Sequence, residues 1–308
     1  MDADPCLLTI DAEPEPSDGG GQSVAWGVGP WHAREFGVLT TVLGDQAPSP
    51  VLDTLSAAIE RIDGNPNPPE VVLLAQPRPG YFAEHEAAAL VRAAPLTRVV
   101  VVAGTWCEGE WRTGRPLAGL PRLYWYEFAA WWRRALADRH GGRQPAWADP
   151  LVDPRWPAWR SRLAGANGTR NGEYKTAANR VAIDVGDYES FIALQLALKP
   201  HGWRCVWQPR HRPEVWNTHR TGGASDAAPV AGIWDGGQLD DVETAALTAF
   251  AGRLAPRAAP VVALLDFPRA EHHAAVRAAG ACAVLGKPYC VDALAEELAR
   301  AVGQRNLA

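Results

Sequence analysis

Lysine is scarce in this chain of 308 residues, because only three of its 30 basic residues are lysines and the rest are arginines. Arginine-rich stretches therefore carry little information here, whereas each lysine is informative. Basic residues are also fewer than acidic residues, 30 against 35, so the formal net charge is −5. Broad binding to nucleic acid or to an anionic membrane usually needs a basic face, so this balance argues against both kinds of partner.

Paired cysteines and long apolar runs are missing as well. The five cysteines lie far apart and include no C-x-x-C pair, which is typical of reduced cytosolic thiols and not of a disulfide framework. No apolar run is long enough to span a membrane, and residues 1–22 hold six acids without the basic region of a signal peptide. We therefore expect a soluble, cytoplasmic protein.

Composition divides the chain into four segments. Residues 1–22 predict a mobile acidic tail, since they end in a glycine-rich run and contain no basic residue. Residues 23–138 and 179–308 each hold enough apolar residues, in regularly spaced runs, for a domain core. Residues 139–178 break this pattern with Pro, Gly, Asn and charges, so they predict a linker that contains tryptophans.

The first predicted domain alternates short apolar runs with amphipathic stretches. Apolar runs that alternate with helical periodicity indicate a parallel sheet covered by helices. The strands are expected at residues 23–28, 71–75, 98–104 and 122–128, and the helices at residues 31–43, 52–62, 82–94 and 129–137.

The second predicted domain repeats the same alternation. Its strands are expected at residues 180–185, 203–208, 230–234, 260–265 and 282–286, and its helices at residues 188–198, 242–254, 270–280 and 291–302. The last helix places apolar residues on one face, as packing against a sheet requires. The chain is therefore predicted to be an α/β protein.

The second domain resembles the receiver domain of bacterial response regulators. The stretch "PVVALLDFPRAEHHAAVRAAGACAVLGKP" is similar to the fourth strand, fourth helix, fifth strand and Lys-Pro pair of that family, and Asp235 of "GIWDGG" lies 52 residues before Lys287. The resemblance implies that Asp235 corresponds to the phosphoacceptor and that Lys287 counters phosphoryl charge. It also implies a cis bond before Pro288, which aims the lysine inward. The fold class is then two flavodoxin-like, doubly wound parallel-sheet domains.

The sequence departs from the family where the chemistry needs a metal and a switch. The family has two adjacent acids after its first strand to hold Mg²⁺, whereas this chain has Asp184 and Asp187 with two residues between them, which predicts at most a weak Mg²⁺ site. The family's switch Ser or Thr corresponds to Leu265, which cannot donate a hydrogen bond. Its switch aromatic corresponds to Val284.

The first domain looks like a more degenerate copy of the same fold. Its third expected strand ends in Gln76 where an aspartate would be needed, and the domain contains no lysine. The same phosphoryl transfer is therefore not expected in this domain.

One loop of the first domain, Gly104–Pro116, concentrates groups that could bind a ligand. It holds Cys107, Glu108, Glu110 and Arg112 after a buried strand. A ligand or partner pocket and a loop of solvated charges both remain open interpretations, and an enzyme centred on Cys107 is a third. A metal site is less expected, because no histidine is near in the sequence.

Tryptophans gather around the predicted linker. They could pack the two domains together or mark a surface for an external partner, and the first interpretation is favoured. The residues are Trp125, Trp131, Trp132, Trp147, Trp156 and Trp159.

These features lead to two hypotheses for function. The leading one is a non-enzymatic signalling protein with tandem degenerate receiver-like domains, which acts by protein–protein contact without phosphorylation and without a cofactor. The alternative is a response regulator that is phosphorylated on Asp235 and needs Mg²⁺ for this reaction. In both, the expected partner is a protein, for example a histidine kinase, and the oligomeric state is left open.

Overall fold

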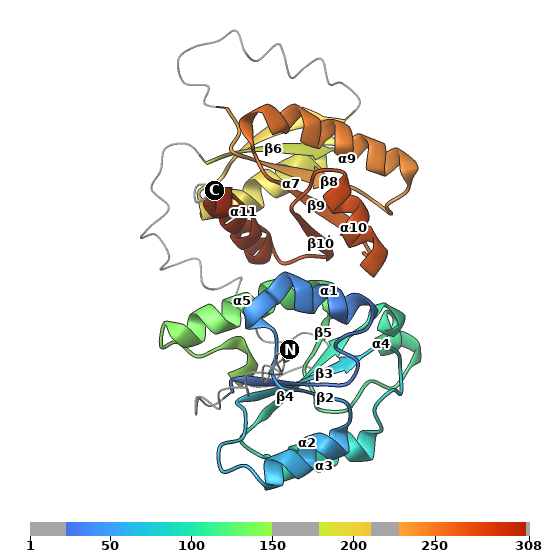
Figure 1. Cartoon of the computed structure of the whole chain (residues 1–308). Coiled ribbons are helices and arrows are strands. Elements are labelled where there is room, and N and C mark those ends of the chain that lie inside the picture. Colours follow the sequence, from blue (N-terminus) through green and yellow to red (C-terminus); the bar gives the residue numbers. More distant parts are fainter. Residues whose placement is uncertain (1–22, 150–178, 211–227, 306–308) are drawn as a thin grey trace, which may run out of the picture.

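The computed structural model describes residues 23–149, 179–210 and 228–305, which form two α/β domains (Figure 1). The predicted acidic tail and residues 150–178 of the predicted linker lie outside the described residues. In the part of the chain that the structure describes, no helix is both long and apolar enough to cross a membrane.

The first domain is built on a five-stranded, all-parallel sheet of order β2-β1-β3-β4-β5. Its strands are β1 (Ala25–Val28), β2 (Val51–Leu52), β3 (Val71–Gln76), β4 (Arg98–Ala103) and β5 (Arg122–Tyr124). Its helices are α1 (Arg34–Leu43), α2 (Leu55–Asp63), α3 (Glu84–Ala93), α4 (Glu110–Thr113) and α5 (Trp125–His140), with short 3₁₀ turns η1 (Gly44–Gln46), η2 (Thr105–Cys107) and η3 (Ala146–Ala148). One apolar core lies between the sheet and α1 with α5, and a second lies between the sheet and α2 with α3.

The second domain repeats this architecture with the sheet order β10-β9-β8-β6-β7, again all parallel. Its strands are β6 (Arg180–Val185), β7 (Arg204–Pro209), β8 (Ala231–Asp235), β9 (Val261–Asp266) and β10 (Ala283–Lys287). Its helices are α7 (Tyr188–Leu198), α9 (Asp241–Leu254), α10 (Ala270–Ala278) and α11 (Val291–Arg305). Helices α7 and α11 cover one face of the sheet, and α9 and α10 cover the other. Both domains therefore have the flavodoxin-like fold that the sequence predicts.

Two local predictions in the first domain were wrong. The strand expected at residues 122–128 ends at Tyr124, and α5 begins at Trp125. Trp125, Phe128 and Trp132 are buried at helical spacing along α5, so tertiary packing decides here over the β propensity of aromatic residues. Strand β2 includes Leu52, where the expected helix of residues 52–62 would begin, and α2 begins only at Leu55. With two residues, β2 is too short to show the alternation of buried and exposed side chains that marks a strand.

Four tryptophans near the predicted linker are buried in the first domain. Trp125, Trp131 and Trp132 lie on α5, and Trp147 of η3 packs on Trp132 with 5.1 Å between the ring centroids. The indole of Trp132 donates a hydrogen bond of 2.6 Å to the carbonyl of Gln46. These rings mainly anchor α5 to its own domain, and Trp156 and Trp159 lie outside the described residues.

Helices α1 and α5 of the first domain face α10, β10 and α11 of the second (Figure 1). The ring of Trp125 lies 5.2 Å from that of His273 on α10, and a Cβ on Gly286 of β10 would collide with the ring of Tyr126. Strand β10 is an edge of its sheet, and edge strands need cover against unwanted pairing. Helix α5 supplies that cover, so the two domains pack as one body.

Ion pairs reinforce the contact between α5 and α11. Arg133 Nη1 lies 2.9 Å from Glu297 Oε1, and Arg134 Nη1 lies 3.1 Å from Glu296 Oε1. The carboxylate of Glu297 also accepts hydrogen bonds from Arg300 on its own helix. Only 8% of the Glu297 side chain is exposed, so this charge is compensated almost entirely by the two arginines.

Candidate functional site

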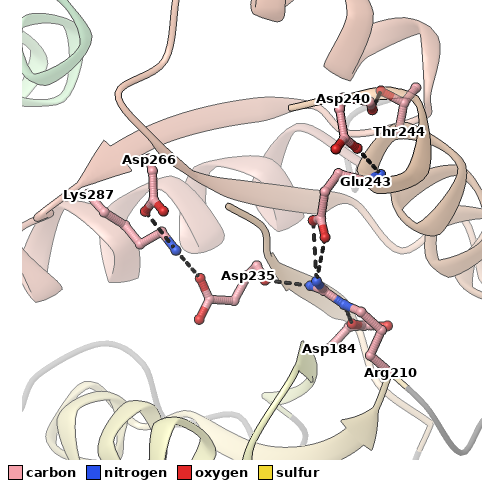
Figure 2. A network of polar contacts seen from close by, with 8 residues as sticks. All are labelled: Asp184, Arg210, Asp235, Asp240, Glu243, Thr244, Asp266 and Lys287. Carbon is pink, nitrogen blue, oxygen red and sulfur yellow. Dashed lines mark hydrogen bonds and ion pairs between the residues drawn. The ribbon is translucent and has the colours of Figure 1, made fainter. Parts of the chain in front are cut away.

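Three neighbouring strands of the second sheet end in charged residues at the same edge. Asp235 ends β8, Asp266 ends β9 and Lys287 ends β10 (Figure 2). The ammonium of Lys287 lies 2.8 Å from Asp235 Oδ1 and 3.0 Å from Asp266 Oδ1. The peptide bond between Lys287 and Pro288 is cis. The structure thus brings together Asp235 and Lys287, as the sequence predicts, and adds Asp266 to them.

The charge of Lys287 is held in place by its two carboxylates. Burial alone would lower the pKa of Lys287, but hydrogen bonds and attraction from Asp235 and Asp266 outweigh burial and raise that pKa above its usual value. Burial, with a contribution from the charge of Asp235, also raises the pKa of the neighbouring Tyr289 phenol. A compact ammonium can bridge two carboxylates that approach from adjacent strands, which favours lysine over a planar guanidinium at this position.

Asp184, the acid at the end of β6, is neutralised by guanidinium groups. Its Oδ1 accepts a hydrogen bond of 2.9 Å from Arg210 Nε, and its Oδ2 accepts one of 3.1 Å from Arg253. The side chain of Asp184 is only 3% exposed. A buried carboxylate is costly unless it is paired and hydrogen-bonded, and both of its oxygens are paired in this way.

Arg210 is the centre of the network around Asp184 (Figure 2). Its Nη1 lies 3.1 Å from Glu243 Oε1 on α9, its Nη2 donates to the backbone carbonyl of Asp235, and its guanidinium stacks 5.0 Å from the ring of Trp234. All three guanidinium nitrogens are therefore engaged. The fork geometry of arginine suits such multiple bonding and keeps the positive charge fixed at this edge.

Asp187 does not join Asp184 in a shared acidic site, which corrects the pairing considered from the sequence. It caps the N-terminus of α7, where its Oδ1 accepts from the backbone amide of Ser190 at 2.7 Å and its Oδ2 from the Ser190 hydroxyl at 2.9 Å. These hydrogen bonds lower the pKa of Asp187. Capping a helix explains an aspartate here without any metal.

The two positions that correspond to the family's switch residues are buried and apolar. Leu265 is fully buried in the core beneath α9 and α10, and Val284 is 9% exposed beside the first domain. The residue that reaches Lys287 is Asp266, one position further along β9. Since side chains alternate between the faces of a strand, Leu265 and Asp266 point in opposite directions.

Sequence reasoning missed four members of this site: Arg210, Glu243, Arg253 and Asp266. Arg210 follows β7, and its place beside Asp184 depends on the register of β6 with β7, in which Asp184 pairs with Gln208. The sequence alone does not give that register. For Asp266 the signal is that a charged residue follows a fully apolar strand.

The site as a whole is a carboxylate cluster compensated by internal cations. Lys287, Arg210 and Arg253 bind Asp235, Asp266, Asp184 and Glu243. Within residues 23–149, 179–210 and 228–305, no group of three or more histidine, cysteine or acidic side chains has an arrangement that could hold a metal ion. The edge of the sheet that such folds use for ligands is therefore filled by the protein's own charges.

The loop Gly104–Pro116 of the first domain places its candidate ligand residues in separate environments. Cys107 is fully buried and donates to the carbonyl of Gln76, and burial raises the pKa of its thiol to about 11. Glu110 is buried in an ion pair with Arg122, whereas Arg112 is exposed. Burial raises the pKa of Glu108, against the opposing charge of Arg269 in the second domain. A buried thiol whose pKa is raised in this way is a poor nucleophile.

Comparisons with known proteins give only distant matches among solved structures. No family model matches the chain, and no curated protein matches it. Among solved structures, a putative pilus assembly-related protein from Burkholderia pseudomallei shares 22% identity over 42% of this chain and 94% of that one, with a TM-score of 0.35. A response regulator receiver domain from Methanospirillum hungatei shares 17% over 42% of this chain and 97% of that one, with a TM-score of 0.34. A signal receiver domain of a histidine kinase from Syntrophus aciditrophicus shares 19% over 41% and 92%, with a TM-score of 0.33.

Proposed function

We propose that this chain is a non-enzymatic signalling protein whose two receiver-like domains act through protein–protein contacts that do not depend on phosphorylation. One observation carries the proposal: the guanidinium groups of Arg210 and Arg253 occupy both oxygens of Asp184. In a receiver domain, the acids at this strand end hold the Mg²⁺ ion. Here a permanent cation of the chain stands beside that carboxylate instead.

This replacement opposes phosphoryl transfer to Asp235. A divalent ion offsets the repulsion between a carboxylate and an incoming anionic phosphodonor, and it organises the transferred group. Arg210 can offset charge, but its nitrogens are already bound to Asp184, Glu243 and the Asp235 carbonyl. Leu265 is buried and cannot hydrogen-bond a phosphoryl group, so a phosphorylated state would have little means to change the surface.

The alternative function is a response regulator that is phosphorylated on Asp235. The observation that favours it is the ion pair of 2.8 Å between Lys287 and Asp235 beside a cis Lys287–Pro288 bond, the arrangement that the resemblance implies for an active site. Only this alternative calls for Mg²⁺ as a cofactor.

A protein partner would have to use surfaces that the domain interface leaves open. The face formed by α10, β10 and α11 is in contact with α1 and α5 of the same chain. Helix α7 lies beside α11 on the same face of the sheet and exposes 52% of Tyr188 and 64% of Leu196. Tyrosine is enriched in protein interfaces, and burial of exposed apolar side chains by a partner favours binding. Helix α7 therefore belongs to the proposed contact surface.

A small phosphodonor tests the proposal directly. The full chain is incubated with acetyl phosphate and Mg²⁺, and the intact mass is measured over time. We expect no phosphorylated species, because the metal position beside Asp184 is taken by arginine. Amide exchange in β10 and α11 is expected to be the same with and without the phosphodonor.

The control is Asp235→Asn, which removes the only carboxylate at the phosphoacceptor position. Stoichiometric labelling of the native chain that this substitution abolishes, together with altered exchange in β10 and α11, would overturn the proposal in favour of the response regulator.

A further inference from the structure

A groove of about 710 Å³ runs between the two domains, away from the edge where Asp235 and Lys287 meet. It is lined by α1 and α5 of the first domain and by α10, β10 and α11 of the second. Small-molecule sites typically have volumes of roughly 300–1,000 Å³ and occur preferentially at domain interfaces. The size and place of this groove therefore match those of a ligand site.

Most of the residues that line the groove are apolar, and the others are mainly charged. Val38 and Val42 of α1 lie on one side and Ala283 of β10 lies on the other, each with part of its side chain accessible from the groove. Such walls favour a ligand with a flat or bulky apolar body, since burial of apolar surface supplies most of the binding free energy.

The charged residues of the groove give it a positive balance, although the chain as a whole is negative. Three arginines, Arg133, Arg277 and Arg300, face a single carboxylate, Glu297. Glu297 already binds Arg133 and Arg300. Among the described residues, Arg277 forms no salt bridge, and its side chain is exposed toward the groove. An anionic ligand could therefore form an ion pair with the guanidinium of Arg277.

His273 adds a polar group that lacks a partner. Its Nε2 is buried, and within the described part of the chain it has no hydrogen-bond partner. Burial, with Arg277 and His272 nearby, lowers the pKa of His273 to about 4, so the ring is neutral at neutral pH. A buried polar atom without a partner is costly.

We propose that the groove between the domains binds a small organic anion with a planar apolar body. The body packs between α1 and β10, and the negative group pairs with Arg277 at the end of α10. This site is separate from the carboxylate cluster around Asp235, so it does not depend on whether that cluster is phosphorylated.

A pair of fluorescent dyes tests the proposal on the full chain. Anilinonaphthalene sulfonate has the proposed chemistry, and phenylnaphthylamine has a similar ring system without the charge. We expect saturable binding of the sulfonate, weakened by high salt because salt screens an exposed ion pair. Arg277→Gln should weaken the sulfonate about three-fold, as expected for one partly exposed ion pair, and leave the neutral dye unchanged.

Two further variants distinguish the effect of losing the Arg277 charge from the effect of filling the groove. Arg92→Gln removes an exposed arginine from the last turn of α3, just as Arg277 lies in the last turn of α10. Because Arg92 does not line the groove, its removal should change the affinity for neither dye. Ala274→Trp fills the groove from an exposed position on α10 and should abolish saturable binding of both dyes. The proposal is overturned if the native chain shows no saturable sulfonate binding, if Arg92→Gln and Arg277→Gln weaken it equally, or if Ala274→Trp has no effect.

Discussion

Replacement of Arg210 by alanine is expected to lower the free energy of unfolding of the second domain by about 3 kcal/mol, the usual cost of removing one partner from a buried ion pair. Asp184, whose side chain is 3% exposed, would keep only Arg253, and Glu243 would lose its partner. The loss should appear in thermal unfolding followed by circular dichroism, as a decrease of roughly 10–15 °C in the melting temperature of that domain.

The matched control is Arg204→Ala, at the start of β7, the strand that Arg210 directly follows. Arg204 is exposed, so its removal should change the free energy of unfolding by no more than about 0.5 kcal/mol. Equal losses in the two variants would show that the network around Arg210 has no special role in stability.

Reversal of the charge at Glu297 is expected to separate the two domains. Glu297→Arg would place a third guanidinium beside Arg133 and Arg300, and like charges brought together at a mostly desolvated contact cost several kcal/mol. The radius of gyration measured by small-angle X-ray scattering should increase, and thermal unfolding should resolve into two transitions.

The compensating variant is Arg133→Glu combined with Glu297→Arg. It restores an opposite-charge pair between α5 and α11, so the radius of gyration should return toward that of the native chain. An unchanged radius in the single Glu297→Arg variant would mean that the apolar contacts of Trp125 and Tyr126 hold the domains together without this ion pair.

Most of the fold could be predicted because its strands are short, continuous apolar runs. Val71–Gln76 and Arg180–Val185 are almost entirely buried, and such runs between amphipathic stretches indicate a parallel sheet. The exceptions have local causes. Strand β2 is too short to show a pattern, and the aromatic residues after Tyr124 have a strand-like composition but a helical spacing.

The candidate site could be predicted only in part, because half of it depends on contacts between distant elements. The separation of Asp235 and Lys287 along the chain, together with the family resemblance, was enough to expect them at one edge of the sheet. The meeting of Asp184, Arg210 and Glu243 depends on the register of β6 with β7 and on the position of α9. No spacing within a single segment encodes that arrangement.

We propose that Arg210 takes the place of a divalent cation at Asp184. Titration with Mn²⁺, followed by the electron paramagnetic resonance signal of the free ion, tests it most directly in the native chain and in Arg210→Ala. In the native chain we expect no Mn²⁺ site that depends on Asp184, and in Arg210→Ala we expect a new site that Asp184→Asn removes. Binding of one Mn²⁺ by the native chain, lost on Asp184→Asn, would contradict this proposal.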